Sequence, residues 1–232
     1  MNLKSLTYIC SIKQTTTMKL DKLKEIIHLG GGNVEGRVVT EPGVILLSET
    51  KTTSVGGEVL DIMNTNRGDY ELAELNARLN YFLTSDKDES YIKDIIFNKK
   101  HMSVLGNVHL SFLIAGVSVD TLVEFTSSKA QMSRISTSTP KFMDETLYSG
   151  TVDDAEFINK FLDLRKEYKA KGGDTETINM FNLESKATIF TVDFSLGNWF
   201  SYLTKIESYP EKEFVRVLKR IKNIIDEKYG IS

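Results

Sequence analysis

The sequence predicts an α/β (α+β) protein, in which amphipathic helices alternate with strands along one chain. Three observations support this fold class. Apolar residues recur at helical spacing across residues 69–82. Apolar and polar residues alternate across 107–115, as in a half-buried strand. A second strand pattern at 186–194 leads directly into a helical pattern at 196–206, so helices and strands belong to the same fold.

The first forty residues are predicted to form an extension, made of a polar leader over 1–17 and one short helix over 20–29. Three glycines at 30–32 follow that helix. They lack the Gly-x-Gly-x-x-Gly spacing and the strand-then-helix order of a phosphate-binding loop, so we interpret them as the end of the helix. The sequence therefore predicts an N-terminal extension over 1–40 and one main domain over 41–232.

The remaining elements are predicted from turn, capping and periodicity signals. They are, in chain order, strands flanking the turn Glu41-Pro42-Gly43, a helix over 88–99, a helix capped by Ser118, a helix over 153–170 closed by Gly172-Gly173, and a last helix that begins at the capping box Ser208-Tyr209-Pro210-Glu211 and ends at Gly230.

Composition argues against several classes of protein. The chain has 29 basic and 32 acidic residues, and a net charge of −3 provides no broad basic field for nucleic acid. No apolar run reaches the roughly 18 residues needed to span a bilayer, and the stretch Leu6–Cys10 is too short for a signal peptide. The single cysteine, Cys10, forms no internal disulfide and fits a reducing compartment. We expect a cytoplasmic protein without membrane or broad nucleic-acid partners and without a protein-built metal site.

Several segments, in one order along the chain, resemble the flavin-dependent thymidylate synthases (the ThyX family). Val59–Met63 is similar to a family strand, and Asn76-Ala77-Arg78 to the Ala-Ala-Arg of the helix that follows it. His101–Asn107 resembles the family segment His-Glu-Ser-Val-Leu-Glu-His. Leu110–Ser118 resembles the next strand, and Leu196–Arg216 resembles a later helical stretch.

The resemblance implies a ThyX-like fold with a central, mostly antiparallel sheet packed with helices. It also implies a homotetramer that methylates dUMP with FAD, methylenetetrahydrofolate and NADPH. In such enzymes hydride from the reduced flavin replaces a protein nucleophile, so the protein's part is to bind, orient and neutralise charge. Arginine suits this role, because its planar guanidinium binds phosphate with two hydrogen bonds.

This sequence departs from the family at its arginines. The Arg-His-Arg signature falls on Ser127-Ser128-Lys129, and an Asn-x-Arg motif falls on Ser195-Leu196-Gly197. Each lost charge-assisted contact removes roughly 1.5–3 kcal/mol of binding, so losing several predicts that FAD and dUMP bind poorly. We therefore expect a catalytically silent ThyX-like binding protein with no catalytic residue. Further arginines of the family fall on Val119, Thr139, Met180 and Ile206.

An alternative interpretation is a diverged enzyme of pyrimidine nucleotide metabolism with a rebuilt anion site. Candidate cofactor-binding residues are His101 and Arg78, which remain near matched positions. A register slip near 127–140 would bring Arg134 into the signature and restore one arginine of the set. The candidate nucleotide-binding residues are Ser127, Lys129, Arg134, Thr137 and Thr139.

Overall fold

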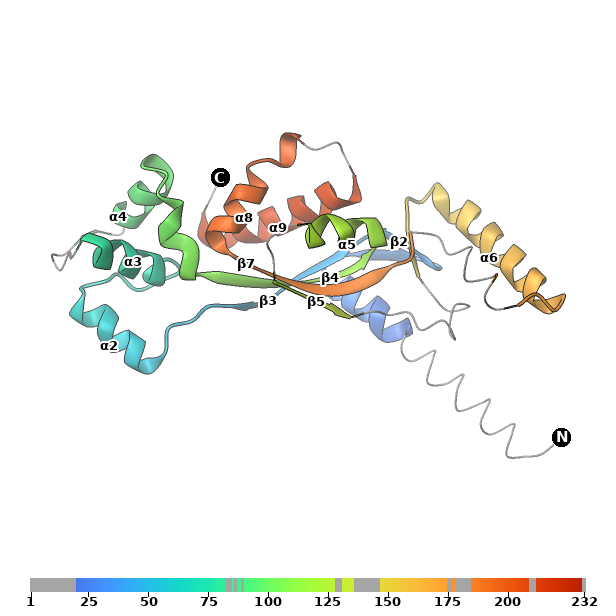
Figure 1. Ribbon diagram of the computed structural model, residues 1–232, viewed down its shortest axis with the longest axis horizontal. Helices are drawn as coiled ribbons and strands as arrows, with labels where there is room; N and C mark the ends of the chain where they lie inside the picture. The colour runs from blue at the N-terminus through green and yellow to red at the C-terminus, as the bar shows by residue number, and fades with distance from the viewer. Residues whose placement is uncertain are drawn as a thin grey trace, which may run out of the picture. The chain divides into compact units, whose positions relative to one another are not determined.

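Figure 1 shows the computed structural model of the chain. It describes residues 20–81, 85, 87–88, 90–127, 131–135, 147–174, 177, 185–208 and 212–230. The chain divides into two compact units. Unit 1 comprises Met1–Ile45 and Leu113–Val192, and unit 2 comprises Leu46–Phe112 and Asp193–Ser232.

Two sheets define the α/β fold class, which confirms the prediction. The smaller sheet has the strand order β1-β2-β6 and lies in unit 1. In it β1 pairs with β2 in antiparallel register, with an irregularity between Asn33 and Val34, and β2 pairs with β6 in parallel. The larger sheet has the order β3-β4-β7-β5, and its first three strands have residues in both units. The strands are β1 (Asn33–Glu35), β2 (Val38–Glu41), β3 (Gly43–Glu49), β4 (His109–Val117), β5 (Gln131–Ile135), β6 (Tyr148–Ser149) and β7 (Thr188–Ser195).

In unit 1 the helix over 20–29 ends at the three glycines, as predicted. Gly31 takes a left-handed φ of 71°, and the amide of Gly32 donates to the carbonyl of Ile27 over 2.8 Å. Gly43 is needed for steric reasons, because a Cβ atom there would lie 2.6 Å from the carbonyl oxygen of Ile27. The helix end therefore packs directly against the start of β3. The core cluster that this helix joins contains Leu23, Ile27, Val39, Ala115, Leu147, Ala187 and Ile189.

The strands around Glu41-Pro42-Gly43 form as predicted, but they do not pair with each other. β2 belongs to the smaller sheet and β3 to the larger one. The backbone φ of Gly43 is not positive, so it does not supply the second central residue of a type II turn. Its missing side chain serves the close approach of Ile27 instead.

Two further helices belong to unit 1. α5 (Val119–Thr126) begins at Ser118, whose hydroxyl accepts a hydrogen bond from the amide of Thr121, as predicted. α6 (Asp154–Ala170) ends at Gly172, which has a φ of 86°. The buried residues Ile158 and Leu162 of α6 pack with Val38 and Tyr148.

Unit 2 is mostly helical around one aromatic cluster. The rings of Phe112 and Phe194 meet the Trp199 ring edge-on, with centroids 5.2 and 4.7 Å away. The indole of Trp199 donates to the carbonyl of Leu110 over 3.2 Å, which satisfies the polar atom of a fully buried side chain. The helical elements are α2 (Ser54–Ile62), α3 (Glu71–Tyr81), α4 (Ser90–Lys93), the π-helix η1 (Asp94–Asn98), the 3₁₀ helices η2 (Met102–Asn107) and η4 (Ile206–Ser208), α8 (Leu196–Leu203) and α9 (Glu213–Tyr229).

Two expectations about unit 2 are wrong. The segment Val59–Met63, expected as a strand by resemblance, lies mostly in α2. The hydroxyl of Thr53 caps α2 by accepting a hydrogen bond from the amide of Gly56. The prediction of a capping box at Ser208 is also wrong. The hydroxyl of Ser208 donates to the carbonyl of Lys205 at the end of η4, and α9 begins later, at Glu213.

Among the described residues, no helix combines the length and the apolar character needed to cross a membrane.

Candidate functional site

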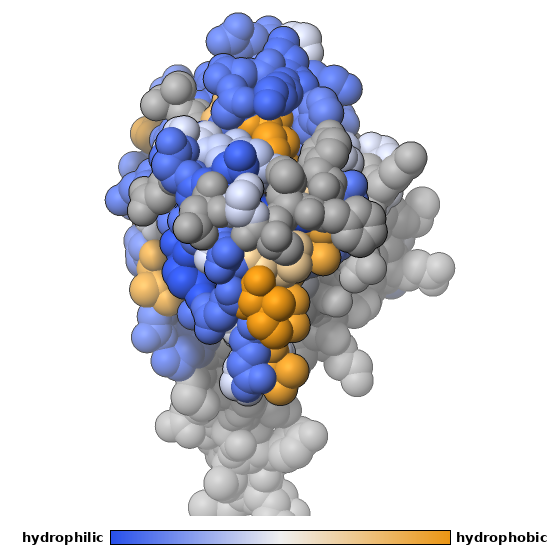
Figure 2. Space-filling view, turned by 90° about the vertical axis from the view of Figure 1, so that its left-hand side faces the viewer, coloured by the Kyte–Doolittle hydropathy of each residue, from blue (hydrophilic) through white to orange (hydrophobic). Residues whose placement is uncertain are grey.

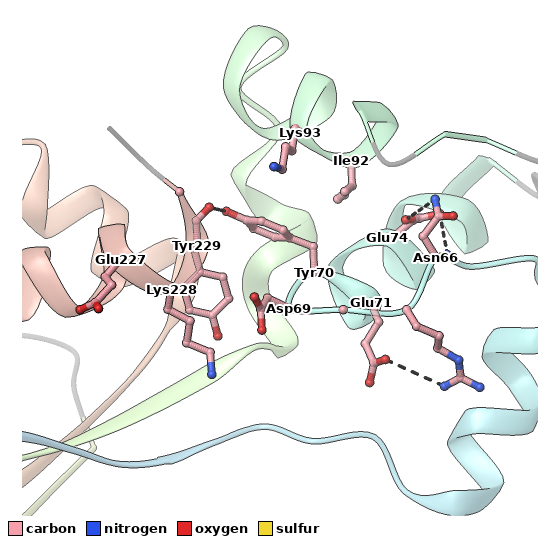
Figure 3. Close-up of a pocket in the computed structure, with 13 residues that line it drawn as sticks. Asn66, Asp69, Tyr70, Glu71, Glu74, Ile92, Lys93, Glu227, Lys228 and Tyr229 are labelled. Atoms are coloured by element: carbon pink, nitrogen blue, oxygen red, sulfur yellow. Dashed lines mark hydrogen bonds and ion pairs between the residues drawn. The ribbon is translucent and has the colours of Figure 1, made fainter.

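Unit 2 contains a polar pocket of about 340 Å³ (Figure 3). The loop before α3, the start of α3, the end of α4 and the end of α9 line it. A second pocket of about 270 Å³ shares Gly68, Asp69, Glu71 and Tyr229 with the first and extends to the end of β3. Asp69 and Tyr229 therefore line two neighbouring pockets.

Two tyrosines hold the end of α9 against the loop before α3. The hydroxyl of Tyr70 donates to the backbone carbonyl of Tyr229 over 2.6 Å, and the two rings meet edge-on at 5.4 Å (Figure 3). The left-handed Gly230 ends α9 directly after this contact. Burial raises the pKa of both phenols, and the carboxylates Glu49 and Asp69 add to the effect on Tyr229. Both phenols therefore stay protonated at neutral pH.

Charged groups of both signs line the pocket. Arg67 is held by the carboxylate of Asp61 at 2.8 Å and by the carbonyl of Gly57 at 2.7 Å. Lys228 forms an ion pair with Glu49. Within the described part of the chain, Asp69, Lys93 and Glu227 have no ion-pair partner. These free charges suit a small polar ligand, and they do not form a concentrated anion site.

Arg78, the one arginine retained at a matched position in α3, is enclosed by its own chain. Its side chain is fully buried, and its Nε donates to Glu74 Oε1 over 2.8 Å. Its Nη2 lies 2.7 Å from the same oxygen, and its Nη1 donates to the carbonyl of Ser85 over 2.9 Å. Glu74, also buried, takes the remaining hydrogen bonds from Asn66. The charge of Arg78 is neutralised inside the protein.

The N-terminus of α8 carries the residues that match the family's Asn-x-Arg. Ser195 is the N-cap, and its hydroxyl accepts from the amide of Asn198 over 3.3 Å. A Cβ atom at Gly197 would lie 3.0 Å from the carbonyl oxygen of Met102 in η2. The glycine thus allows α8 and η2 to pack closely at the position that the resemblance matches to an arginine.

A second polar cluster lies where β4 and β7 carry neighbouring side chains in unit 2. His109 Nδ1 lies 2.8 Å from one carboxylate oxygen of Asp193, and the hydroxyl of Ser111 donates to the other. The carboxylate stands between the imidazole and the hydroxyl, so the imidazole has no contact through which to activate the serine. The arrangement differs from a catalytic triad for this reason.

The structure places the predicted site residues in different units. Arg78 and His101 belong to unit 2, where His101 is exposed before η2. Ser127 belongs to unit 1, is exposed at the end of α5, and donates to the carbonyl of Glu124 over 2.7 Å. Arg134 belongs to β5, also in unit 1. Lys129, Thr137 and Thr139 lie outside the described residues, so the nucleotide-binding set stays a prediction.

Comparison with known proteins identifies the fold. Two solved structures of a UMP/dUMP methylase, PolB from Streptomyces cacaoi, match the chain with TM-scores of 0.54 and 0.55. One is bound with 5-Br UMP and the other with 5-Br dUMP. Each match has 9% sequence identity and covers 83% of this chain, and 92% and 93% of the respective PolB chains. The fold is therefore ThyX-like, as the sequence predicted.

No family model matches the chain, and no curated protein matches it by sequence.

The described residues at matched positions do not fit FAD. Arg78 is neutralised by Glu74, Gly197 has no side chain, and Ile206 is a buried apolar residue in η4. These positions offer no free cation to the pyrophosphate of a flavin dinucleotide. Within the part of the chain that the structure describes, there is also no group of three or more residues able to hold a metal ion.

Sequence reasoning missed the pocket of Figure 3. Two of its central residues, Asp69 and Tyr70, lie far along the chain from the third, Tyr229, and none of them belongs to a motif. One signal was present, because Gly230 was recognised as the end of a helix and Tyr229 comes directly before it. Only the folded structure brings that tyrosine beside Tyr70 in the loop before α3.

Proposed function

We propose that this chain is a ThyX-fold protein that does not methylate dUMP and acts by binding a partner or another small molecule. The observation that carries the proposal is the packing at Gly197. Where the family resemblance expects an arginine, the backbone of η2 lies within 3.0 Å of any added Cβ atom. An arginine there would push the carbonyl of Met102 back by a few tenths of an ångström, and the glycine that is present offers no side chain for a phosphate contact.

Arg78 supports the same conclusion. A buried guanidinium held by a carboxylate and a carbonyl serves the stability of unit 2, because separating it from Glu74 would leave an uncompensated buried charge. Ile206, another position matched to an arginine, is buried among apolar residues. The scaffold of the fold is kept while its charges are redirected or removed. In this proposal the pocket of Figure 3 is the place to look for a ligand.

The test is an activity assay on the full chain with dUMP, FAD, methylenetetrahydrofolate and NADPH, read by the formation of dTMP. An active flavin-dependent thymidylate synthase under the same conditions is the control. We expect no dTMP above the enzyme-free background. Formation of dTMP that depends on both the chain and FAD would overturn the proposal.

A diverged enzyme acting on another pyrimidine nucleotide is the second candidate function. One observation favours it: the similar PolB structures hold 5-Br UMP and 5-Br dUMP. Thermal unfolding with UMP, dUMP, CMP and dCMP separates the two candidates, since a ligand at 100 times its Kd adds about 2.7 kcal/mol to stability. A clear rise in melting temperature with one nucleotide would favour the enzyme. We expect no such rise in melting temperature. We also propose that the protein is a cytoplasmic homo-oligomer.

A further inference from the structure

Helix α6 has two apolar faces, and the described part of the chain buries only one of them. Ile158 and Leu162 are buried against Val38 and Tyr148. On another face Phe157 is 65% exposed, Leu164 64% and Tyr168 43%. Large apolar side chains with this much exposure, gathered on one helix, are typical of a surface that another protein covers.

The spacing of the exposed face is that of a helix that packs on another helix. Phe157, the half-buried Phe161, Leu164 and Tyr168 follow one another at intervals of four, three and four residues. This is the alternation of the two apolar positions of a coiled-coil heptad. The helix has 17 residues, so the apolar row extends over most of its length of roughly 25 Å.

The charges of α6 indicate which partner fits. Its first half carries Asp153, Asp154 and Glu156 against Lys160, and its second half carries Arg165, Lys166, Lys169 and Lys171 against Asp163 and Glu167. The first half is therefore acidic on balance and the second half basic. When two copies of this helix lie antiparallel, the acidic end of each lies beside the basic end of the other. A parallel pair would place like charges together at both ends. The pattern is therefore complementary to itself in one orientation only.

We propose that the exposed face of α6, defined by Phe157, Phe161, Leu164 and Tyr168, binds the same face of a second copy of this chain in antiparallel orientation. In this pairing Phe157 of one copy lies opposite Tyr168 of the other, and Lys160 lies near Glu167, because both flank the apolar row on the same side of the helix. The proposal does not depend on the nucleotide chemistry. A standard interface buries about 800 Å² per partner, more than one helix face offers, so the dimer is weak and depends on concentration.

A second exposed apolar face lacks this self-complementarity. Val55, Val59 and Ile62 of α2 are exposed, and Figure 2 shows hydrophobic side chains gathered on the face of the molecule where α2 lies. α2 carries Glu58 and Asp61 and no basic residue. Two copies of α2 would bring carboxylates together in either orientation, so this face serves as the control surface.

The first experiment measures the self-association of the full chain by sedimentation over a range of concentrations. We expect a monomer–dimer equilibrium that Leu164→Glu weakens about hundredfold or more, because each dimer loses two buried leucines and gains two buried carboxylates. Val55→Glu, at a position of matched exposure (68%), leaves the Kd unchanged. A wild type that stays monomeric, an unaffected Leu164→Glu dimer, or a dimer lost on Val55→Glu would each overturn the proposal.

A cross-linking experiment tests the orientation in a Cys10→Ser background. The two-fold axis falls between residues 162 and 163, so Leu164→Cys lies close to its own copy and forms a disulfide-linked dimer on oxidation. Phe157→Cys lies roughly 16 Å along the axis from its own copy in the antiparallel pair and does not cross-link. Efficient cross-linking of Phe157→Cys would contradict the antiparallel arrangement.

Reversing charges provides an independent readout that does not depend on the apolar contacts. Lys160→Glu and Glu167→Lys each weaken the dimer about tenfold by placing like charges side by side. The double variant restores the wild-type Kd, because the exchanged charges are complementary again. Failure of the double variant to recover would refute the pairing of these two positions. Circular dichroism confirms that all variants remain folded.

Discussion

Replacing Arg78 with methionine should lower the free energy of unfolding by about 3–5 kcal/mol, because Glu74 would keep a buried charge without a counter-charge. The two side chains are 0% and 2% exposed, so water screens the loss very little. The variant also leaves the carbonyl of Ser85 without its hydrogen bond from the guanidinium. Urea denaturation at neutral pH measures the change.

Two control variants distinguish the loss of the buried ion pair from the loss of a positive charge in general. Lys22→Met removes an exposed cation from its ion pair with Glu25, where both side chains are about two-thirds exposed, and should leave the free energy of unfolding almost unchanged. The double variant Glu74→Gln with Arg78→Met removes both charges and should recover much of the lost stability. If Arg78→Met were as stable as Lys22→Met, the guanidinium would be available for a ligand and the reasoning would fail.

Two other features of the structure give measurable expectations. Burial raises the pKa of Tyr229 above its unfolded value of about 10. The contribution of this phenol to the free energy of unfolding is therefore constant below about pH 10. Above about pH 10 it falls by up to about 1.4 kcal/mol per pH unit, because the unfolded state loses the proton first. Tyr229→Phe should cost little at neutral pH and should make the alkaline decline in urea-melt stability shallower; an identical decline would contradict this. Gly43→Ala should destabilise unit 1 by about 1–3 kcal/mol, since its Cβ would collide with the carbonyl of Ile27. Thermal unfolding measures the loss, and a variant as stable as the wild type would show that the helix end can move.

Long periodic segments were predictable from the sequence because burial of one face leaves a repeating pattern. In α9 Phe214, Val217, Leu218 and Ile221 recur at helical spacing and are all buried. The alternation in β4 was predictable for the same reason. The end of α6 was predictable because Gly172, which follows it, readily takes a left-handed φ. The spacing of residues along the chain was sufficient to predict an element wherever its conformation did not depend on a distant packing partner.

Short elements and long-range contacts were not predictable. β6 has two residues and exists only because β2 pairs with it. α2 contains two glycines, which disfavour a helix, although Val55, Val59 and Ile62 recur at helical spacing and Thr53 caps its start. Glu74 and Arg78 have the spacing of an ordinary surface pair, so the sequence did not reveal that both are buried. Only the packed structure shows that the retained arginine is enclosed.

Binding of FAD tests the central claim most directly. The purified chain is incubated with FAD, passed through a desalting column, and examined for the absorbance bands of a bound flavin. The account predicts a colourless protein, because Arg78 is neutralised by Glu74 and Gly197 leaves no side chain at its matched position. A flavin that stays with the chain in equimolar amount would contradict the account, since the residues that remain would then form a working cofactor site.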